Sequence, residues 1–279
     1  MNEWKFAWRI MGILVLVFLF IPILFIVIYS FNSGRLLVSW GGFSFDPYIQ
    51  LGQNDNILRS VWTSVRVALL TALLATVLGS LAGIVLARIG GRGKRLLLIM
   101  LALVLVTPEI VNAVALLPWF VFLGVDLHMP FFNNGVARMV IGHSLFSTAV
   151  VAFVVQARVG SLNASLDESA ADLYATPVRR FMQITVPLMM PAVLSGALLA
   201  FTMSLDNVVI SSFVSVQGST PWPVVVFGSL KQGLTPEMAA MSVIMFLALM
   251  LTLLLAVLVL RRSASSKEIA GMLAGGSQK

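Results

Sequence analysis

Long apolar stretches dominate this sequence, and they restrict its possible folds more than any other feature. A helix needs about 20 apolar residues to cross the hydrocarbon core of a bilayer. We expect six membrane-spanning helices at about 10–31, 57–87, 96–123, 138–158, 187–213 and 237–261. Gly79 and Gly83 form a small-xxx-small face on the second span, which allows close helix packing. Because backbone polar groups inside a bilayer must pair with one another, these stretches predict an all-α membrane protein.

The composition agrees with this class of protein. Of 279 residues, 59% are hydrophobic and 10% are charged, whereas soluble domains carry about 25% charged residues. The first span, residues 10–29, is too long for the core of a signal peptide, and no Ala-x-Ala cleavage site follows it. The chain contains no cysteine, which excludes a disulfide framework and a metal site built from thiolates.

The distribution of positive charge predicts the orientation. The net charge of +7 could suggest a nucleic-acid partner, but the basic residues lie beside apolar spans rather than on one basic face. With a cytoplasmic N-terminus, thirteen of the 18 Lys and Arg residues fall on the cytoplasmic side, where positive charge is usually in excess. We therefore expect both termini in the cytoplasm, a transmembrane domain over 1–262, and a disordered tail over 263–279.

A polar interruption separates the fourth and fifth spans and carries both signs of charge. We expect it in the cytoplasm over 159–186, with Ser165 and Glu168 spaced as a capping box that starts a short helix. Thr176 before Pro177 predicts a second helix start, since proline at the first helical position loses no hydrogen bond. Loops between spans are usually featureless, so a structured loop predicts a docking surface for another protein.

The same loop resembles the EAA loop of ABC-importer permeases. That motif reads Glu-Ala-Ala, three residues, Gly, nine residues, and Ile-x-Leu-Pro. Here Glu168-Ser169-Ala170, Tyr174 and Ile184-Thr185-Val186-Pro187 keep the spacing. Tyrosine stands where the motif has a glycine, a residue that permits a left-handed turn. With SLDNVVISSF at 204–213 and TPEIV at 107–111, the whole chain resembles the polyamine (putrescine/spermidine) ABC-importer permeases.

This resemblance implies a type I ABC-importer permease fold and a translocation subunit that is not itself an enzyme. It would carry a di- or polyamine, such as putrescine or spermidine, across the bacterial inner membrane. The implied partners are a second permease, two ATP-binding subunits that use ATP and Mg, and a periplasmic substrate-binding protein, with no cofactor on this chain. The residues implied to couple the permease to the ATPase are Asp167, Glu168, Ser169, Ala170, Ala171, Asp172, Leu173, Tyr174, Ala175, Thr176 and Pro177.

Two carboxylates, those of Glu109 and Asp206, lie inside apolar stretches. A charged side chain in the bilayer costs about 2.5–3.5 kcal/mol on insertion scales, so we expect both to face an internal cavity that selects cations. Pro108 weakens helical bonding before Glu109 and could free carbonyl groups for ammonium ions. The resembling permeases often have an Asp-Asp pair where this chain has Asp206-Asn207, which adds Asn207 to the expected substrate pathway.

Other side chains in the spans carry weaker indications. Trp119 and Trp222 could contact an amine through cation–π attraction, although tryptophan is ordinary at a membrane interface. His143, alone in the fourth span, is expected to pack or to form an interhelical hydrogen bond. The basic turn RIGGRGKR at 88–95 lacks the Ser or Thr of a phosphate-binding loop. No hydrolase triad, metal cluster or nucleotide motif occurs in the sequence.

The residues alone leave alternatives to an amine importer. Arg66 or Arg138 could neutralise one carboxylate as a structural ion pair. A permease of the same superfamily could carry iron or an anion, although two acids in the pathway argue against anions. A secondary transporter or channel could use the acids as a proton or cation relay, but it would give the cytoplasmic loop no role. A membrane scaffold would leave both acids unexplained.

Overall fold

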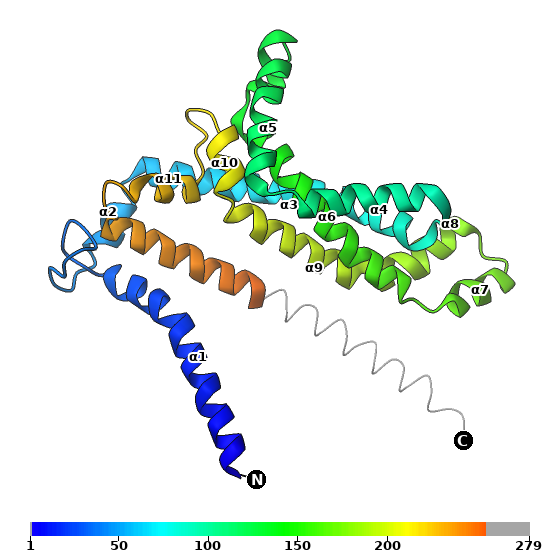
Figure 1. Ribbon diagram of the computed structural model, residues 1–279, viewed down its shortest axis with the longest axis horizontal. Helices are drawn as coiled ribbons and strands as arrows, with labels where there is room; N and C mark the ends of the chain where they lie inside the picture. The colour runs from blue at the N-terminus through cyan, green and yellow to red at the C-terminus, as the bar shows by residue number, and fades with distance from the viewer. Residues whose placement is uncertain (1, 255–279) are drawn as a thin grey trace. The chain divides into compact units, whose positions relative to one another are not determined.

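The computed structural model describes residues 2–254, which are helical apart from their loops and one isolated antiparallel bridge between Asn32 and Phe43. Within that range six helices are long and apolar enough to cross a membrane: Phe6–Tyr29, Asp55–Arg88, Glu109–Asp126, Gly135–Gly160, Pro177–Leu205 and Pro236–Leu254. They confirm the expected all-α membrane protein with six spanning helices (Figure 1). The end of the sixth expected span and the tail over 263–279 lie outside the described residues.

The chain divides into two compact units at Arg59/Ser60 and Val225/Val226. The first unit contains α1 (Asn2–Tyr29), α2 (Asp46–Leu51), the beginning of α3 (Asp55–Arg88), the end of α11 (Trp222–Ser229), and the helix Pro236–Leu254. Side-chain amides organise its loops. Asn32 Nδ2 donates to the Ser39 carbonyl at 2.8 Å, and Asn54 Nδ2 donates to Glu237 Oε2 at 3.0 Å.

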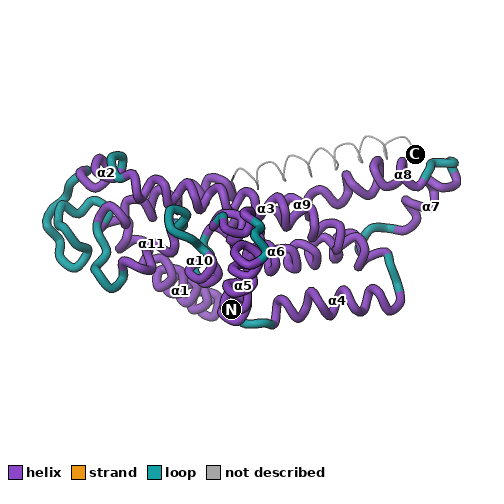
Figure 2. Tube along the Cα trace, turned by 90° about the horizontal axis from the view of Figure 1, so that it is seen from above, coloured by secondary structure: helices purple, strands orange, loops and turns teal. Residues whose placement is uncertain are grey.

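The second unit is built around α6 (Gly135–Gly160), which packs against α3 and α9 (Val186–Leu205) (Figure 2). Buried Val151 and Val155 of α6 form a core cluster with Ala75 and Met189. The contact with α3 is close because a Cβ added at Gly79 would lie 2.6 Å from the Val151 Cβ. The small-residue face predicted on the second span is therefore the face that meets α6.

The third expected span, 96–123, is divided into two helices. α4 (Gly91–Val106) ends before Thr107 and Pro108, both of which have extended backbones, and α5 (Glu109–Val121) begins in a new direction (Figure 1). Proline lacks a backbone donor and disfavours a helical residue before it, which explains the break. The helix of membrane length is α5 together with the π-helical turn η1 (Phe122–Asp126), and α4 has 16 residues. The prediction of one continuous span was wrong here.

The fifth expected span, 187–213, is also interrupted. α9 ends at Leu205, residues 206–208 are not helical, and α10 (Val209–Val214) follows as a short helix. At the other end, the span begins with α8 (Pro177–Arg180) and the π-helical turn η3 (Phe181–Thr185), ten residues earlier than expected. Pro187 cannot donate a backbone hydrogen bond, and η3 lies just before it. The break places Asp206 directly after the last residue of α9.

Candidate functional site

The two helix breaks meet, and they bring the two predicted carboxylates to one place. Glu109 is the first residue of α5, and Asp206 follows the last residue of α9. Asn207 Nδ2 donates a hydrogen bond to Glu109 Oε1 and joins the breaks. Around them lies a cavity of about 630 Å³ lined by residues 105–109 and 206–210 and by His143, Phe146, Ser147 and Met203.

The lining of this cavity carries two acids and no Lys or Arg. The Asp206 side chain is exposed, and among residues 2–254 it forms no hydrogen bond or ion pair with another residue. Arg138 is buried and donates from Nε to the Phe132 carbonyl. In the described part of the chain, neither Arg66 nor Arg138 forms an ion pair with Glu109 or Asp206, so the structural ion pair considered above is not formed. An acidic recess of this kind attracts cations.

The ends of four helices add their backbone groups to the cavity. α4 and α9 both end there, so their last carbonyl groups present partial negative charge. α5 and α10 begin there, and their amino ends are met by side chains. Glu109 lies in the first turn of α5, and Asn207 Oδ1 accepts from the backbone nitrogens of Ile210 at 3.0 Å and Ser211 at 3.3 Å. The charge left unpaired is negative and lies on Asp206 and the free carbonyls.

His143 forms the interhelical hydrogen bonds that its isolated position in the fourth span predicted. Its Nδ1 lies 2.8 Å from Ser204 Oγ on α9, and its Nε2 lies 3.0 Å from Ser211 Oγ on α10. Sequence reasoning missed both serines. The available signal was two hydroxyl residues that flank Asp206 within an otherwise apolar stretch.

The structure does not bring the two predicted tryptophans to this cavity. Trp119 stands ten residues along α5 from Glu109, is 54% exposed, and stacks on Phe122 at 6.0 Å. Trp222 is buried, and its backbone nitrogen donates to Ser64 Oγ at 2.8 Å. Of the expected pathway residues, the structure unites Asp206, Glu109 and Asn207, and it leaves Trp119 and Trp222 apart from them.

The loop over 159–186 forms α7 (Ala164–Asp172) and then α8, with one helix start as predicted and one corrected. Thr176 Oγ1 accepts from the Arg179 backbone nitrogen, which confirms the start at Pro177. The first helix is capped by Asn163, whose Oδ1 accepts from the Ser165 backbone nitrogen at 3.0 Å. The predicted Ser165–Glu168 capping box was wrong, because asparagine is an equally good cap and lies two residues earlier.

Tyr174 adopts the left-handed conformation that the motif glycine would favour, with φ of 56°. The Tyr174 nitrogen donates to the Ala171 carbonyl at 2.8 Å, and the Ala175 nitrogen donates to the Ala170 carbonyl at 3.0 Å. This pair of bonds is the Schellman closure of a helix end. The turn after α7 therefore forms in spite of the side chain, which is 96% exposed.

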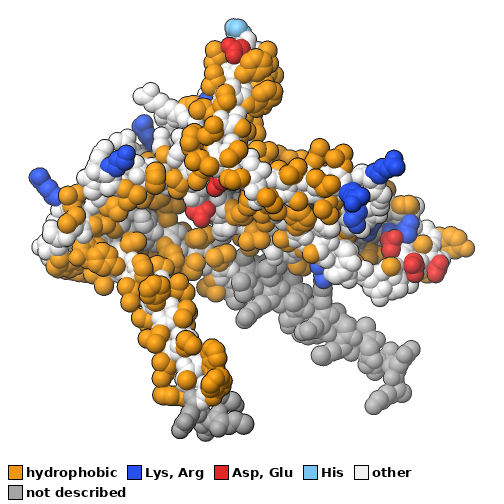
Figure 3. Space-filling view, viewed as in Figure 1, with side chains coloured by type: hydrophobic (Ala, Val, Ile, Leu, Met, Phe, Trp, Pro, Cys, Tyr) orange, Lys and Arg blue, Asp and Glu red, His pale blue; other side chains and the backbone are white. Residues whose placement is uncertain are grey.

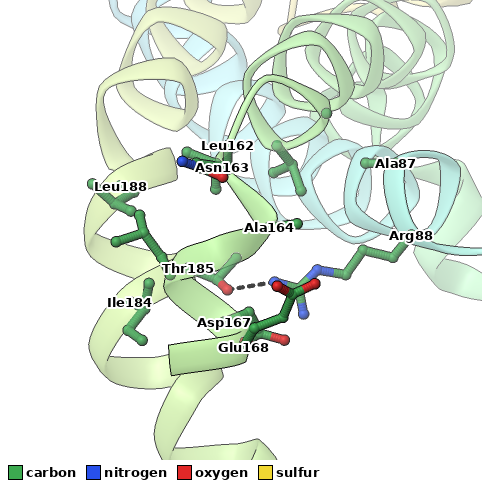
Figure 4. Close-up of a pocket in the computed structure, with 13 residues that line it drawn as sticks. Ala87, Arg88, Leu162, Asn163, Ala164, Asp167, Glu168, Ile184, Thr185 and Leu188 are labelled. Carbon is green, nitrogen blue, oxygen red and sulfur yellow. Dashed lines mark hydrogen bonds between the residues drawn. The ribbon is translucent and has the colours of Figure 1, made fainter. Parts of the chain in front are cut away.

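Three contacts fix this loop and the helix ends beside it. Arg180 pairs with Asp167 at 3.2 Å, and Arg88 at the end of α3 donates to Thr185 Oγ1 at 2.5 Å. Arg158 Nε donates to the Leu188 carbonyl at 3.0 Å. A pocket of about 470 Å³ lies between these elements, with Arg88 reaching across it (Figure 4). Arg88 thus bonds the loop to α3, Arg180 joins α8 to α7 within the loop, and Arg158 joins α6 to α9 beside it.

The outer surface of the loop combines exposed apolar side chains with acids. Leu173, Tyr174 and Val178 are 82%, 96% and 70% exposed. Acidic side chains gather over α7 (Figure 3), where the sequence has Asp167, Glu168 and Asp172. An exposed apolar edge beside charge is typical of a protein–protein docking surface.

Comparison with known proteins gives one family model and several close relatives. The model described as "Binding-protein-dependent transport system inner membrane component" matches residues 75–266. The chain is 41% identical over 237 residues to the "Putrescine transport system permease protein PotI" of Escherichia coli (strain K12), and 84% of each chain is covered. It is 37% identical over 246 residues to the "Spermidine/putrescine transport system permease protein PotC" of Haemophilus influenzae, which covers 88% of this chain and 93% of the relative.

Solved structures share the fold at low sequence identity. A bacterial ABC transporter involved in the import of the acidic polysaccharide alginate superposes with a TM-score of 0.74 at 15% identity, covering 94% of this chain and 96% of that chain. The inward-facing MetNI methionine ABC transporter gives 0.64 at 15% identity, covering 78% and 98%. These likenesses confirm the expected type I ABC-importer permease fold, and at such identity they show the fold alone.

Proposed function

This chain belongs to the family of binding-protein-dependent transport system inner membrane components, and we propose that it is the permease subunit of an ATP-driven importer for a di- or polyamine such as putrescine. It is a multi-pass permease with the helices of an ABC-importer translocation subunit. Two relatives named for putrescine or for spermidine and putrescine support this substrate class. The proposal places both termini and the loop over 159–186 in the cytoplasm.

The observation that carries the substrate class is the unpaired acidic cavity at the two helix breaks. A site that binds an amine cation needs carboxylate or carbonyl oxygens and no neighbouring Lys or Arg. The lining of this cavity meets both conditions. In our proposal Asp206 accepts hydrogen bonds from an ammonium group. Glu109, oriented by the Asn207 amide, provides a second carboxylate. Trp119 and Trp222 remain proposed contacts elsewhere along the route.

We propose that the partner ATPases bind the loop from Asp167 to Pro177 and act on the permease through it. Two ATP-binding subunits would bind ATP and Mg and hydrolyse the nucleotide, whereas this chain would bind no cofactor. The loop is continuous with α6 and α9, which border the cavity, and is bonded to α3 through Arg88. A displacement of α7 would therefore move helices that border the cavity, which supports a role in transmission. A second permease chain and a periplasmic binding protein complete the proposed assembly.

Asp206→Asn tests the cation role, and Asp126→Asn is its matched control. Both remove one carboxylate from the second unit, but only Asp206 lines the cavity. A hydrogen bond to a charged group contributes about 1.5–3 kcal/mol, so putrescine uptake by the assembled importer should fall roughly 10- to 150-fold in the Asp206 variant. Uptake that is equal in the two variants would reject the proposed role.

A proton- or cation-coupled secondary transporter, unlike an ATP-driven importer, would move its substrate without ATPase partners. Purified chain reconstituted alone in liposomes should move no putrescine in our proposal, and adding the copurified ATPase and permease subunits should restore transport. Amine movement by the chain alone would contradict an ATP-driven mechanism.

A further inference from the structure

A continuous series of hydrogen bonds crosses both helix breaks. His143 on α6 contacts Ser204 on α9 and Ser211 on α10. The Ser211 backbone nitrogen donates to Asn207 Oδ1 at 3.3 Å, and Asn207 Nδ2 donates to Glu109 at the start of α5. Four helices are therefore linked at the level of the cavity through one histidine and one asparagine.

The histidine end of this series is enclosed. His143, Ser204 and Ser211 are 3%, 4% and 0% exposed. In a neutral imidazole one ring nitrogen donates and the other accepts, and a serine hydroxyl can do either, so both contacts can form hydrogen bonds at once. The two serines lie on opposite sides of the non-helical residues 206–208. His143, which lies on α6, consequently bridges the break between α9 and α10.

We propose that His143 is a positioning residue for the amine site. α10 has six residues, and a helix of that length does not hold its place without tertiary contacts. By fixing Ser204 and Ser211, the imidazole sets the separation between α9 and α10. That separation determines where the Asp206 carboxylate and the Asn207 amide stand. The inference rests on the proposed function, because amine occupancy of the cavity is its readout.

The absence of cysteine from the sequence permits a direct assay. A single cysteine introduced as Val208→Cys lies in the cavity lining. Its modification by a small cationic thiol reagent should be slowed by putrescine when the amine occupies the cavity. The putrescine concentration that gives half-protection is measured on the assembled importer in nanodiscs, with the melting temperature of each variant recorded alongside.

Ser204→Ala and Ser211→Ala each remove one bond to the imidazole and should raise the half-protecting concentration about 3- to 10-fold, the factor that corresponds to one neutral hydrogen bond. Adding Ser204→Ala to His143→Leu should have no further effect, because the bond is already absent. His143→Gln, which offers one donor and one acceptor, should recover most of the protection. The matched control is Ser144→Ala, since Ser144 Oγ donates within α6 to the Ile141 carbonyl.

The outcomes separate this inference from the proposed function. If both serine variants behave like Ser144→Ala while Asp206→Asn abolishes protection, the positioning role is overturned and the amine site stands. If putrescine fails to protect the introduced thiol in the importer that carries Val208→Cys alone, the amine site and the positioning role are both overturned. The single serine variants decide the question even where His143→Leu does not assemble.

Discussion

Replacing Asn207 by aspartate changes one heavy atom of the side chain, and it therefore tests the electrostatic interpretation of the cavity. The amide nitrogen that donates to Glu109 becomes an oxygen, and the size of the side chain is unchanged. Aspartate can still accept from the backbone nitrogens of Ile210 and Ser211, because it caps helices as well as asparagine does. The substitution therefore keeps the cap on α10 and changes only the interaction of residue 207 with the carboxylates of Glu109 and Asp206.

The expected loss of stability follows from two terms. Removing a hydrogen bond to a carboxylate costs about 1.5–3 kcal/mol of unfolding free energy. Two carboxylates about 4 Å apart repel by roughly 4 kcal/mol at an effective dielectric constant of about 20, although proton uptake relieves part of this repulsion. The net loss of unfolding free energy should be at least about 2 kcal/mol, which lowers the melting temperature by about 4–8 °C. A bound dication neutralises the added charge, so putrescine should stabilise this variant more than it stabilises the unmutated chain.

The assay is thermal unfolding of the assembled importer in nanodiscs at constant ionic strength, with and without putrescine. The matched control is Asn134→Asp, because Asn134 caps α6 in the same way, by accepting from the backbone nitrogens of Val136 and Ala137, and lines no part of the cavity. Equal melting temperatures for the two variants, with equal responses to putrescine, would refute the reasoning.

Three further changes address the loop and the packing. Tyr174→Gly relieves a left-handed tyrosine and should stabilise the fold by about 1–2 kcal/mol; an unchanged or lower melting temperature contradicts this. Gly79→Val places a Cβ 2.6 Å from α6, whereas Gly12→Val meets nothing within 4 Å. Only the former should fail to accumulate in the membrane, and equal amounts of the two would argue against close packing. Arg88→Gln removes the charged bond from α3 to η3 and should lower the amine transported per ATP hydrolysed. The exposed Arg92→Gln is its control, and an equal ratio in both would reject a role in coupling.

The number of spans could be predicted because apolar length is a property of the sequence itself. The helix breaks could not be placed, because hydropathy does not report backbone angles. Pro108 was recognised as a weak point, but α4 and α5 were predicted as one helix. The spans expected around Glu109 and Asp206 were continuous helices, so the sequence identified both acids without revealing that two helix breaks bring them together.

Differences between expectation and structure at single residues have equally local causes. Trp119 was expected to contact the amine, but ten residues of α5 extend about 15 Å from Glu109, and Trp119 does not line the cavity. Asn163 and Ser165 compete for the same cap, and pattern alone does not rank them. The partners of His143 depend on the helix break between Ser204 and Ser211, which only tertiary structure defines.

The bond between Asn207 and Glu109 has a consequence for biosynthesis. The two residues are 98 positions apart, so at about 5–20 residues per second roughly 5–20 s separate their emergence from the ribosome. During that interval the Glu109 carboxylate enters the bilayer, or the insertion machinery, without its amide donor. The nascent chain must hold this acid near water or other polar groups until the fifth span arrives. The acidic cavity, with its bond between Asn207 and Glu109, is thus completed only when the fifth span inserts.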